Sequence, residues 1–236
     1  MTRAIAILML ACASGPALAD HRETRDLSLP AAGLEALRID AGAGSLRVTG
    51  VPAAEAITVT ALVRVPGADA EEAARVMARH MVLRLDADGP VARLDSWFEN
   101  RFRLFGQSPG IDLEVRLPAA LRLDIKDGSG SVEVRDMAGP VAVEDGSGSL
   151  DLEAIGGPVD IDDGSGSISV RDVGGDLTIK DGSGSIAVEQ VAGSVRIEDG
   201  SGGITVTGVG GDLHIPRAGS GSVRISGVQG SVNRGD

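Results

Sequence analysis

The chain is poor in cysteine, in aromatic residues and in long apolar runs, and each shortage excludes something. Its 236 residues include one cysteine, no tyrosine and only four aromatic residues. Four aromatic side chains are too few for the stacking platform that binds single-stranded nucleic acid. No segment has the eighteen or so consecutive apolar residues that a membrane-spanning helix needs.

Positive charge is also scarce. The chain has 22 lysines and arginines against 34 aspartates and glutamates, a formal net charge of −12. An acidic surface repels phosphate backbones and anionic lipid headgroups. We therefore expect no nucleic-acid partner and no attachment to anionic lipid by charge alone.

Residues 1–19 have the pattern of a secretory signal. Arg3 supplies a positive start, an apolar stretch runs from Ala4 to Cys12, and Ala17-Leu18-Ala19 is a small-x-small cleavage site before Asp20. The pattern predicts an exported protein whose mature chain begins at Asp20, without a thiol, a disulfide or a cysteine metal site. Periplasmic and surface locations both stay open.

Cys12 has one alternative role. The segment Met9-Leu10-Ala11-Cys12 faintly resembles a bacterial lipobox, in which the cysteine is acylated and becomes the mature N-terminus. Met9 is a poor match at the first lipobox position, so cleavage after Ala19 fits the general rule better.

The C-terminal half is repetitive. The motif Asp-Gly-Ser-Gly recurs every eighteen residues, and apolar-x-apolar triplets recur every nine. The triplets begin at Val132, Val141, Leu150, Val159, Ile168, Leu177, Ile186, Val195, Ile204 and Leu213, and continue after a one-residue insertion at Val223 and Val232.

Each triplet alternates inward and outward residues, as a half-buried strand does. Two kinds of Gly-rich turn alternate between the strands, one Asp-Gly-Ser-Gly and one apolar. This predicts a mainly β fold, a parallel β-solenoid flattened into two strands per eighteen-residue turn. An antiparallel meander also permits the spacing, but Arg135, Glu153, Arg171 and Glu189 alternate in sign every eighteen residues and favour the coil.

The less regular residues 20–126 are predicted to form a small α+β cap on the solenoid of residues 127–236, because solenoid ends need covering. Leu37 and Leu46 each begin a triplet of a degenerate first unit. A helix is expected at about 69–82, capped by Asp69 with Glu72 in the capping-box position. Strands are expected near 57–65, 82–85, 91–96 and 111–117.

These residues resemble the bacterial putative-adhesin families of unknown function, also described as β-strand-repeat domains. The resemblance rests on the exported start, the early Gly-rich strand pair, the helix, the Asp-Leu-Glu-Val-Arg-Leu-Pro run at 112–118 and the Gly-Ser-Gly-Ser repeats. It implies a cell-envelope or surface setting, with envelope-stress systems associated with some relatives. It implies no catalytic residues.

The most distinctive chemical feature is a column of aspartates, one in each Asp-Gly-Ser-Gly turn: Asp127, Asp145, Asp163, Asp181 and Asp199. Stacked about 4.8 Å apart, five like charges repel unless something compensates them. One interpretation is a calcium site, although the order of residues departs from known calcium-binding nonapeptides. The other is an Asx-turn, in which each carboxylate is screened by solvent and by its own turn amides.

All four aromatic residues fall within nine positions, at Trp97, Phe98, Phe102 and Phe105, interleaved with Arg101 and Arg103. Such a loop suits contact with a membrane or a partner. The alternative is that these side chains cover the open end of the solenoid or pack on the helix.

No catalytic site is predicted. The serines of the turns (Ser129, Ser147, Ser165, Ser183 and Ser201) need a histidine base to act as nucleophiles, and none of His21, His80 and His214 is placed to serve them. The leading hypothesis is a non-enzymatic envelope or surface protein that binds or scaffolds an unknown protein or glycan. The alternatives are a calcium-stabilised structural module, an envelope-stress accessory protein and a polysaccharide-acting enzyme.

Overall fold

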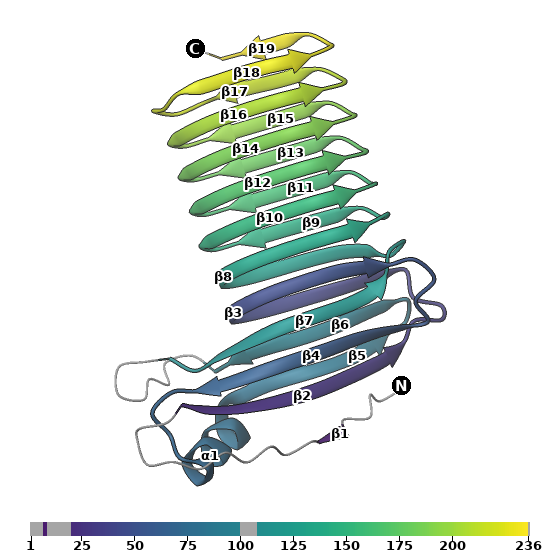
Figure 1. Cartoon of the computed structure of the whole chain (residues 1–236), viewed down its shortest axis with the longest axis vertical. Coiled ribbons are helices and arrows are strands. Elements are labelled where there is room, and N and C mark those ends of the chain that lie inside the picture. Colours follow the sequence, from purple (N-terminus) through teal and green to yellow (C-terminus); the bar gives the residue numbers. More distant parts are fainter. Residues whose placement is uncertain (1–6, 9–19, 100–107, 236) are drawn as a thin grey trace.

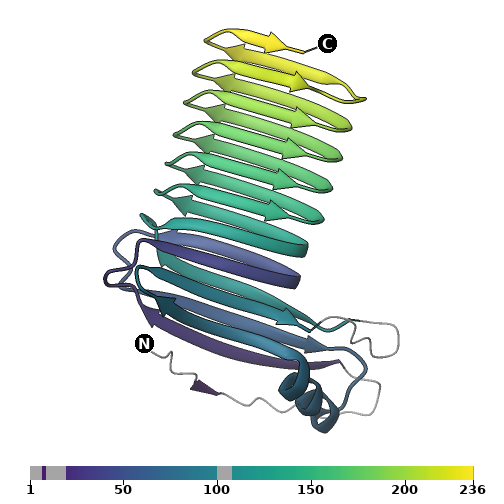
Figure 2. The ribbon, with the colours of Figure 1, turned by 180° about the vertical axis from the view of Figure 1, so that it is seen from behind.

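The fold is a parallel β-solenoid of about six turns with about eighteen residues in each, and one short helix. The computed structural model describes residues 7–8, 20–99 and 108–235. The turns stack into a column, and the N-terminal strands and the helix lie at one end of it (Figure 1, and from behind in Figure 2). No helix among these residues is long and apolar enough to cross a membrane.

Each repeating turn contains one long and one short strand. The long strands form one face: β10 (Gly148–Ile155), β12 (Gly166–Val173), β14 (Gly184–Val191), β16 (Gly202–Val209) and β18 (Val223–Val228). The short strands form the other: β9 (Val141–Asp145), β11 (Val159–Asp163), β13 (Leu177–Asp181), β15 (Val195–Asp199), β17 (Leu213–Arg217) and β19 (Val232–Arg234).

Neighbouring turns pair in parallel with a shift of eighteen residues. Leu150 pairs with Ile168 and Ile168 with Ile186 on the long-strand face, and Val159 pairs with Leu177 on the short-strand face. The predicted coil is therefore confirmed, and the meander is wrong. The inward residues of both faces meet in a thin core in which Ile168, Val170 and Ile179 are at most 1% exposed.

The Gly-Ser-Gly turns leave no room for a side chain at their second glycine. Gly184 has a φ of +153°, and a Cβ on it would lie 1.5 Å from the carbonyl oxygen of Gly166 in the turn below. This close stacking of backbone on backbone explains why glycine recurs every eighteen residues.

The first turn of the solenoid is split in the sequence. β3 (Ala36–Val51) and β8 (Arg122–Met137) are long strands that each run across both faces, and they pair in parallel from Ala36–Arg122 to Thr49–Arg135. The unit predicted around Leu37 and Leu46 is β3. The division expected at residue 126 falls inside β8, so the chain continues there without a break.

The chain between β3 and β8 builds the cap. On the long-strand face, β7 (Gly110–Pro118) pairs in parallel with β3, then antiparallel with β4 (Ala56–Val65), which pairs with β2 (His21–Pro30). On the other face, β6 (Val91–Phe98) pairs with β3 and with the antiparallel β5 (Met81–Asp88). A two-residue strand, β1 (Ile7–Leu8), pairs with β2.

Helix α1 (Ala70–His80) packs at the end of the cap and buries Ala73, Val76 and Met77. Its start follows the prediction: the Asp69 carboxylate accepts a hydrogen bond from the backbone N–H of Glu72 at 2.8 Å. The helix ends two residues before the predicted position because Met81 is extended and begins β5.

Candidate functional site

The aspartate column lies inside the solenoid, along one edge of the core. Asp127, Asp145, Asp163, Asp181 and Asp199 are each at most 6% exposed. Neighbours are in register, as Asp163 is with Asp181. Solvent therefore does not screen the column, contrary to the expectation from the sequence.

The turn amides hold one oxygen of three of these carboxylates, those of Asp163, Asp181 and Asp199. The backbone N–H groups of Ser165, Ser183 and Ser201 donate to Oδ1 of the aspartate two positions earlier, at 3.2, 3.1 and 2.9 Å. These are Asx-turns. The other oxygen, Oδ2, of Asp163, Asp181 and Asp199 is buried and has no hydrogen-bond partner among the described residues.

Burial without full hydrogen bonding favours the neutral acid. Burial, reinforced by the charge of the neighbouring Asp145, raises the pKa of Asp127 to about 7. Burial and the neighbouring Asp163 raise the pKa of Asp181 to about 6. Asp127 and Asp181 therefore bind protons at a higher pH than an ordinary aspartate does, and each bound proton reduces the repulsion along the column.

Calcium in this column stays a prediction. Within the described parts of the chain, no group of three or more histidine, cysteine, aspartate or glutamate side chains is arranged to hold a metal ion. Consecutive aspartates stack in one line along the edge of the core, whereas a calcium ion needs six to eight oxygen atoms around it.

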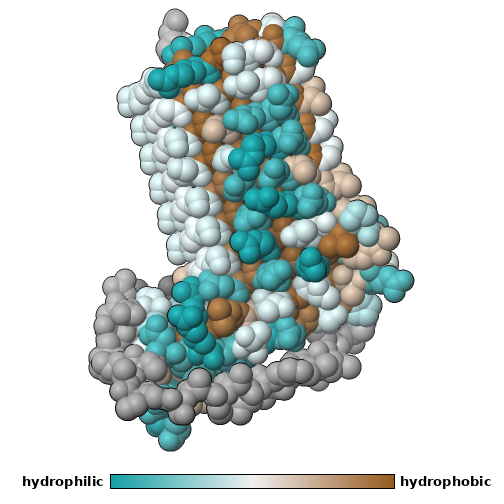
Figure 3. Space-filling view, in the orientation of Figure 1, coloured by the Kyte–Doolittle hydropathy of each residue, from teal (hydrophilic) through white to brown (hydrophobic). Residues whose placement is uncertain are grey.

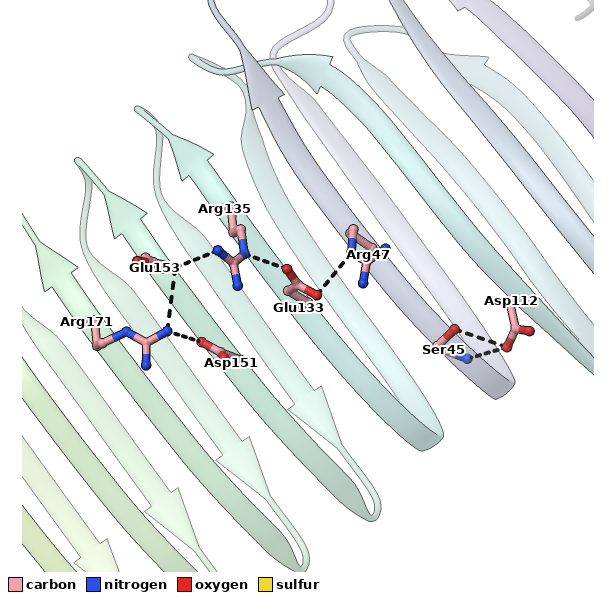
Figure 4. Close-up of polar contacts among 8 residues, drawn as sticks. All are labelled: Ser45, Arg47, Asp112, Glu133, Arg135, Asp151, Glu153 and Arg171. Atoms are coloured by element: carbon pink, nitrogen blue, oxygen red, sulfur yellow. Dashed lines mark hydrogen bonds and ion pairs between the residues drawn. The ribbon is translucent and has the colours of Figure 1, made fainter.

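The second candidate is a belt of ion pairs across the long-strand face, which we call the charged belt (Figure 4). Glu153 lies between two arginines of the adjacent turns, 2.8 Å from Arg135 and 3.5 Å from Arg171. Glu133 extends the belt towards the cap, 3.0 Å from Arg47 and 2.5 Å from Arg135. Of the alternating series predicted at Arg135, Glu153, Arg171 and Glu189, the first three make such contacts, because eighteen residues separate stacked positions.

Beside the belt, the Ser45 backbone N–H and hydroxyl both donate to Oδ1 of Asp112, at 2.9 and 3.1 Å. The sequence analysis singled out neither this contact nor Arg47 and Glu133. In the space-filling view, hydrophilic residues form a column along the face that is drawn, beside an edge of intermediate hydropathy (Figure 3). The belt is a flat, ordered polar surface.

The opposite face carries a shallow charged recess of about 490 Å³ where β6, β3, β8 and β9 meet. Arg38, Arg93 and Arg122 line it together with Asp40 and Asp95. Burial, followed by the charge of Asp95, raises the pKa of Asp40. The recess mixes charges of both signs and has no aromatic lining.

Of the aromatic cluster, only Trp97 and Phe98 belong to the described residues; Phe102 and Phe105 lie outside them, as do the predicted Cys12 lipidation site and the Ala19 cleavage site. Phe98 is half-buried and packs against the core. Trp97 is half-buried beside Gly42 of β3, where a Cβ would lie 2.9 Å from the Trp97 Cβ. The proposed contact loop stays a prediction.

The histidines do not meet the serines of the turns. His214 Nδ1 lies 2.8 Å from Arg196 on the short-strand face, and His21 lies 3.9 Å from Glu23 in β2. His80 ends α1 in the cap.

No model of a known protein family matches the chain, and no curated protein matches it. Two solved structures are similar in outline. One, described as a putative cell adhesion protein from Clostridium sporogenes, is 12% identical with a TM-score of 0.36, over 90% of this chain and 98% of that one. The other, described as a putative adhesin from Bacteroides fragilis, is 14% identical with a TM-score of 0.41, over 91% of this chain and 97% of that one. Both names agree with the families that the sequence resembles.

Proposed function

We propose that the protein is a non-enzymatic component of the cell envelope or surface that binds or scaffolds a partner through its flat solenoid faces. The observation that carries the proposal is the charged belt. Its side chains are held by ion pairs between successive turns before any partner arrives, for example Glu153 between Arg135 and Arg171. Side chains that are already ordered lose less conformational entropy on binding.

The distribution of apolar residues supports the same proposal. The apolar side chains of the repeats are buried inside the solenoid. The recess on the short-strand face is shallow and mostly polar. Enzymes that act on small substrates usually enclose them in deeper, mostly apolar pockets. The export signal predicted at residues 1–19 supports an envelope or surface location.

The test is retention of the mature chain, residues 20–236, by isolated envelopes of the organism that encodes it, separated into peptidoglycan sacculi and membranes. We expect saturable retention by one fraction and a loss of about tenfold in affinity for the double variant Arg135→Glu, Arg171→Glu. The double variant Arg75→Glu, Arg79→Glu, which makes the same charge change on the exposed side of α1, is the matched control.

Two results would overturn the proposal. One is retention that the belt variant and the control reduce equally, or no retention by any fraction. The other is release of reducing ends from envelope polysaccharide, which would make the protein an enzyme.

A further inference from the structure

Two pairs of like charges lie side by side in the recess on the short-strand face. Because β3 and β6 are parallel and in register, Arg38 lies opposite Arg93, and two residues further along Asp40 lies opposite Asp95. Like charges directly opposite each other on neighbouring strands repel. Like-charge neighbours also occur on other strands, but among the described strands only β3 and β6 place a basic pair next to an acidic pair.

Several other charges of the recess compensate one another. Arg122 lies 2.7 Å from the Asp124 carboxylate, and Arg38 lies 3.6 Å from the same group. Lys126 lies 3.9 Å from Glu144. Asp124 is thus shared by two arginines, and the Arg38 side chain is held only by the longer contact and stays 53% exposed.

Arg93 has no such compensation. The acid opposite it on β5 is Asp86, but Arg84 of the same strand lies 3.1 Å from Asp86 and also contacts Asp95. Within the described ranges, the exposed Arg93 takes part in no ion pair and no side-chain hydrogen bond. Its guanidinium is therefore available to an anion from outside the chain.

Asp40 is the acidic counterpart of Arg93. Lys126 lies opposite it on β8 and lowers its pKa, but burial, followed by the charge of Asp95, outweighs this and raises the pKa. In the part of the chain that the structure describes, Asp40 also has no ion pair and no side-chain hydrogen bond. Asp160, the remaining charged residue of the recess, lies further away on β11. A cation beside Asp40 would relieve its repulsion with Asp95.

We propose that the recess binds a short peptide in its zwitterionic form, with the terminal carboxylate between Arg38 and Arg93 and the terminal ammonium against Asp40. Guanidinium groups match the planar carboxylate and hold it with charge-assisted hydrogen bonds. An anion alone would meet the acidic pair next to its site, and a cation alone would meet the basic pair. A ligand that carries both charges meets neither repulsion.

The spacing of the two pairs sets the length of the peptide. Two residues along a strand span about 6.6 Å, and a fully extended dipeptide spans about 7 Å. A dipeptide therefore reaches from one pair to the other, and the recess of about 490 Å³ has the volume of a small-ligand site. The recess and the charged belt lie on opposite faces, so this site goes beyond the proposed function and does not depend on it.

The experiment is an NMR titration of isotope-labelled residues 20–236 with the dipeptide alanyl-alanine at low ionic strength, where exposed charges are least screened. We expect saturable shifts of the amide signals of β3 and β6 around the recess. The N-acetylated dipeptide lacks the positive charge and the C-amidated dipeptide lacks the negative one, so each should bind about fivefold more weakly or worse. Free alanine and tetra-alanine, whose charges are too close together and too far apart, should also bind more weakly.

Two variants assign the ends of the peptide. Arg93→Gln and Asp40→Asn should each weaken binding of the dipeptide by about fivefold. Arg93→Gln should leave the already weak binding of the amidated form unchanged, and Asp40→Asn that of the acetylated form. The matched controls are Arg116→Gln, at an exposed position of β7 on the other face, and Asp162→Asn of β11, and neither should change the affinity. Circular dichroism confirms that each variant is folded.

Equal binding of the dipeptide and its acetylated or amidated form would mean that the recess takes a simple anion or cation, and would overturn the inference. So would the absence of saturable shifts, or shifts centred on the charged belt. Envelope retention that depends on Arg135 and Arg171 is measured on the other face, so the proposed function stands or fails independently of this result.

Discussion

At the scale of single residues, the aspartate column makes the stability of the protein depend on pH in an uncommon direction. A carboxylate that is paired with a cation has its pKa lowered. Here the pKa values of Asp127 and Asp181 rise to about 7 and about 6, above the 3.8 of an ordinary aspartate, because burial dominates. The native state thus binds these protons more tightly than the unfolded state does.

The stabilisation from these protons is complete below a pH of about 3.8 and is lost as the pH rises through about 6 to 7. Arginine neighbours lower the pKa of Glu133 and of Glu198, so these ionised carboxylates stabilise the folded protein. This stabilisation is lost only at acidic pH, as the pH falls below their ordinary pKa of 4.5. We therefore expect the melting temperature of residues 20–236 to be higher at about pH 5 than at about pH 8. A melting temperature that rises from about pH 5 to about pH 8 would contradict the raised pKa values.

The variant Asp181→Asn tests whether the aspartate column causes this pH dependence of stability. Asparagine keeps the Oδ1 acceptor for the Ser183 N–H but carries no charge. We expect it to raise the melting temperature at about pH 8 by about 2–4 °C, as a gain of about 1 kcal/mol does in a chain of this size, and to change little at about pH 5. The exposed neighbour Asp162→Asn is the control. The same melts with EDTA and with calcium test the metal interpretation, which a large rise with calcium would support.

At the scale of the strand, the alternation of side chains decides which positions tolerate charge. Ile168 of β12 is 1% exposed in a core only two side chains thick. Ile168→Asp buries a carboxylate with no cation near it, so we expect the solenoid to lose cooperative unfolding. Ser167→Asp places the same group one residue away on the exposed side and should melt almost like the unchanged protein. Cooperative unfolding of the Ile168→Asp protein by circular dichroism would show that the inward assignment is wrong.

The same alternation determines how far the sequence predicts the fold. The strands of the repeats could be predicted because Val132, Leu150 and Ile168 mark each turn at a constant spacing. The pairing of β4 with β7 could not, because it joins Thr58 to Arg116 through an irregular segment without a repeat. The alternation also contained a signal that the sequence analysis missed: Asp127 comes two residues after the inward Ile125, and this places its carboxylate inside.

The candidate site shows a similar limit. Stacking predicted the contacts of Arg135, Glu153 and Arg171, since these residues recur every eighteen positions. Arg47 reaches Glu133 only because β3 and β8 pair directly, although the residues of the cap separate the two strands in the sequence. No local sequence pattern predicts that pairing.

At the scale of the whole molecule, the solenoid is a stack of interchangeable turns, so a complete turn should be removable. Deleting residues 166–183 joins Ser165 to Gly184 and keeps the Asp-Gly-Ser-Gly-Ser order at the junction. We expect this protein to fold and to melt cooperatively at a somewhat lower temperature. Deleting only residues 166–174 removes half a turn and brings a long strand against a short one, so we expect no cooperative melt. Equal stability of the two proteins would contradict the eighteen-residue unit.

The split first turn sets an order of assembly. β3 cannot complete its pairing until β8, which begins 71 residues after the last residue of β3, is also available, so in a protein exported from its N-terminus the first part of the solenoid would wait for the cap. From β8 onward each turn needs contacts only with the turn eighteen residues earlier, and such closely spaced contacts form quickly. In an exported protein, every further turn that folds outside the membrane makes backward sliding of the chain unfavourable. A protein exported from its N-terminus would thus be drawn outward by its own folding, one turn at a time.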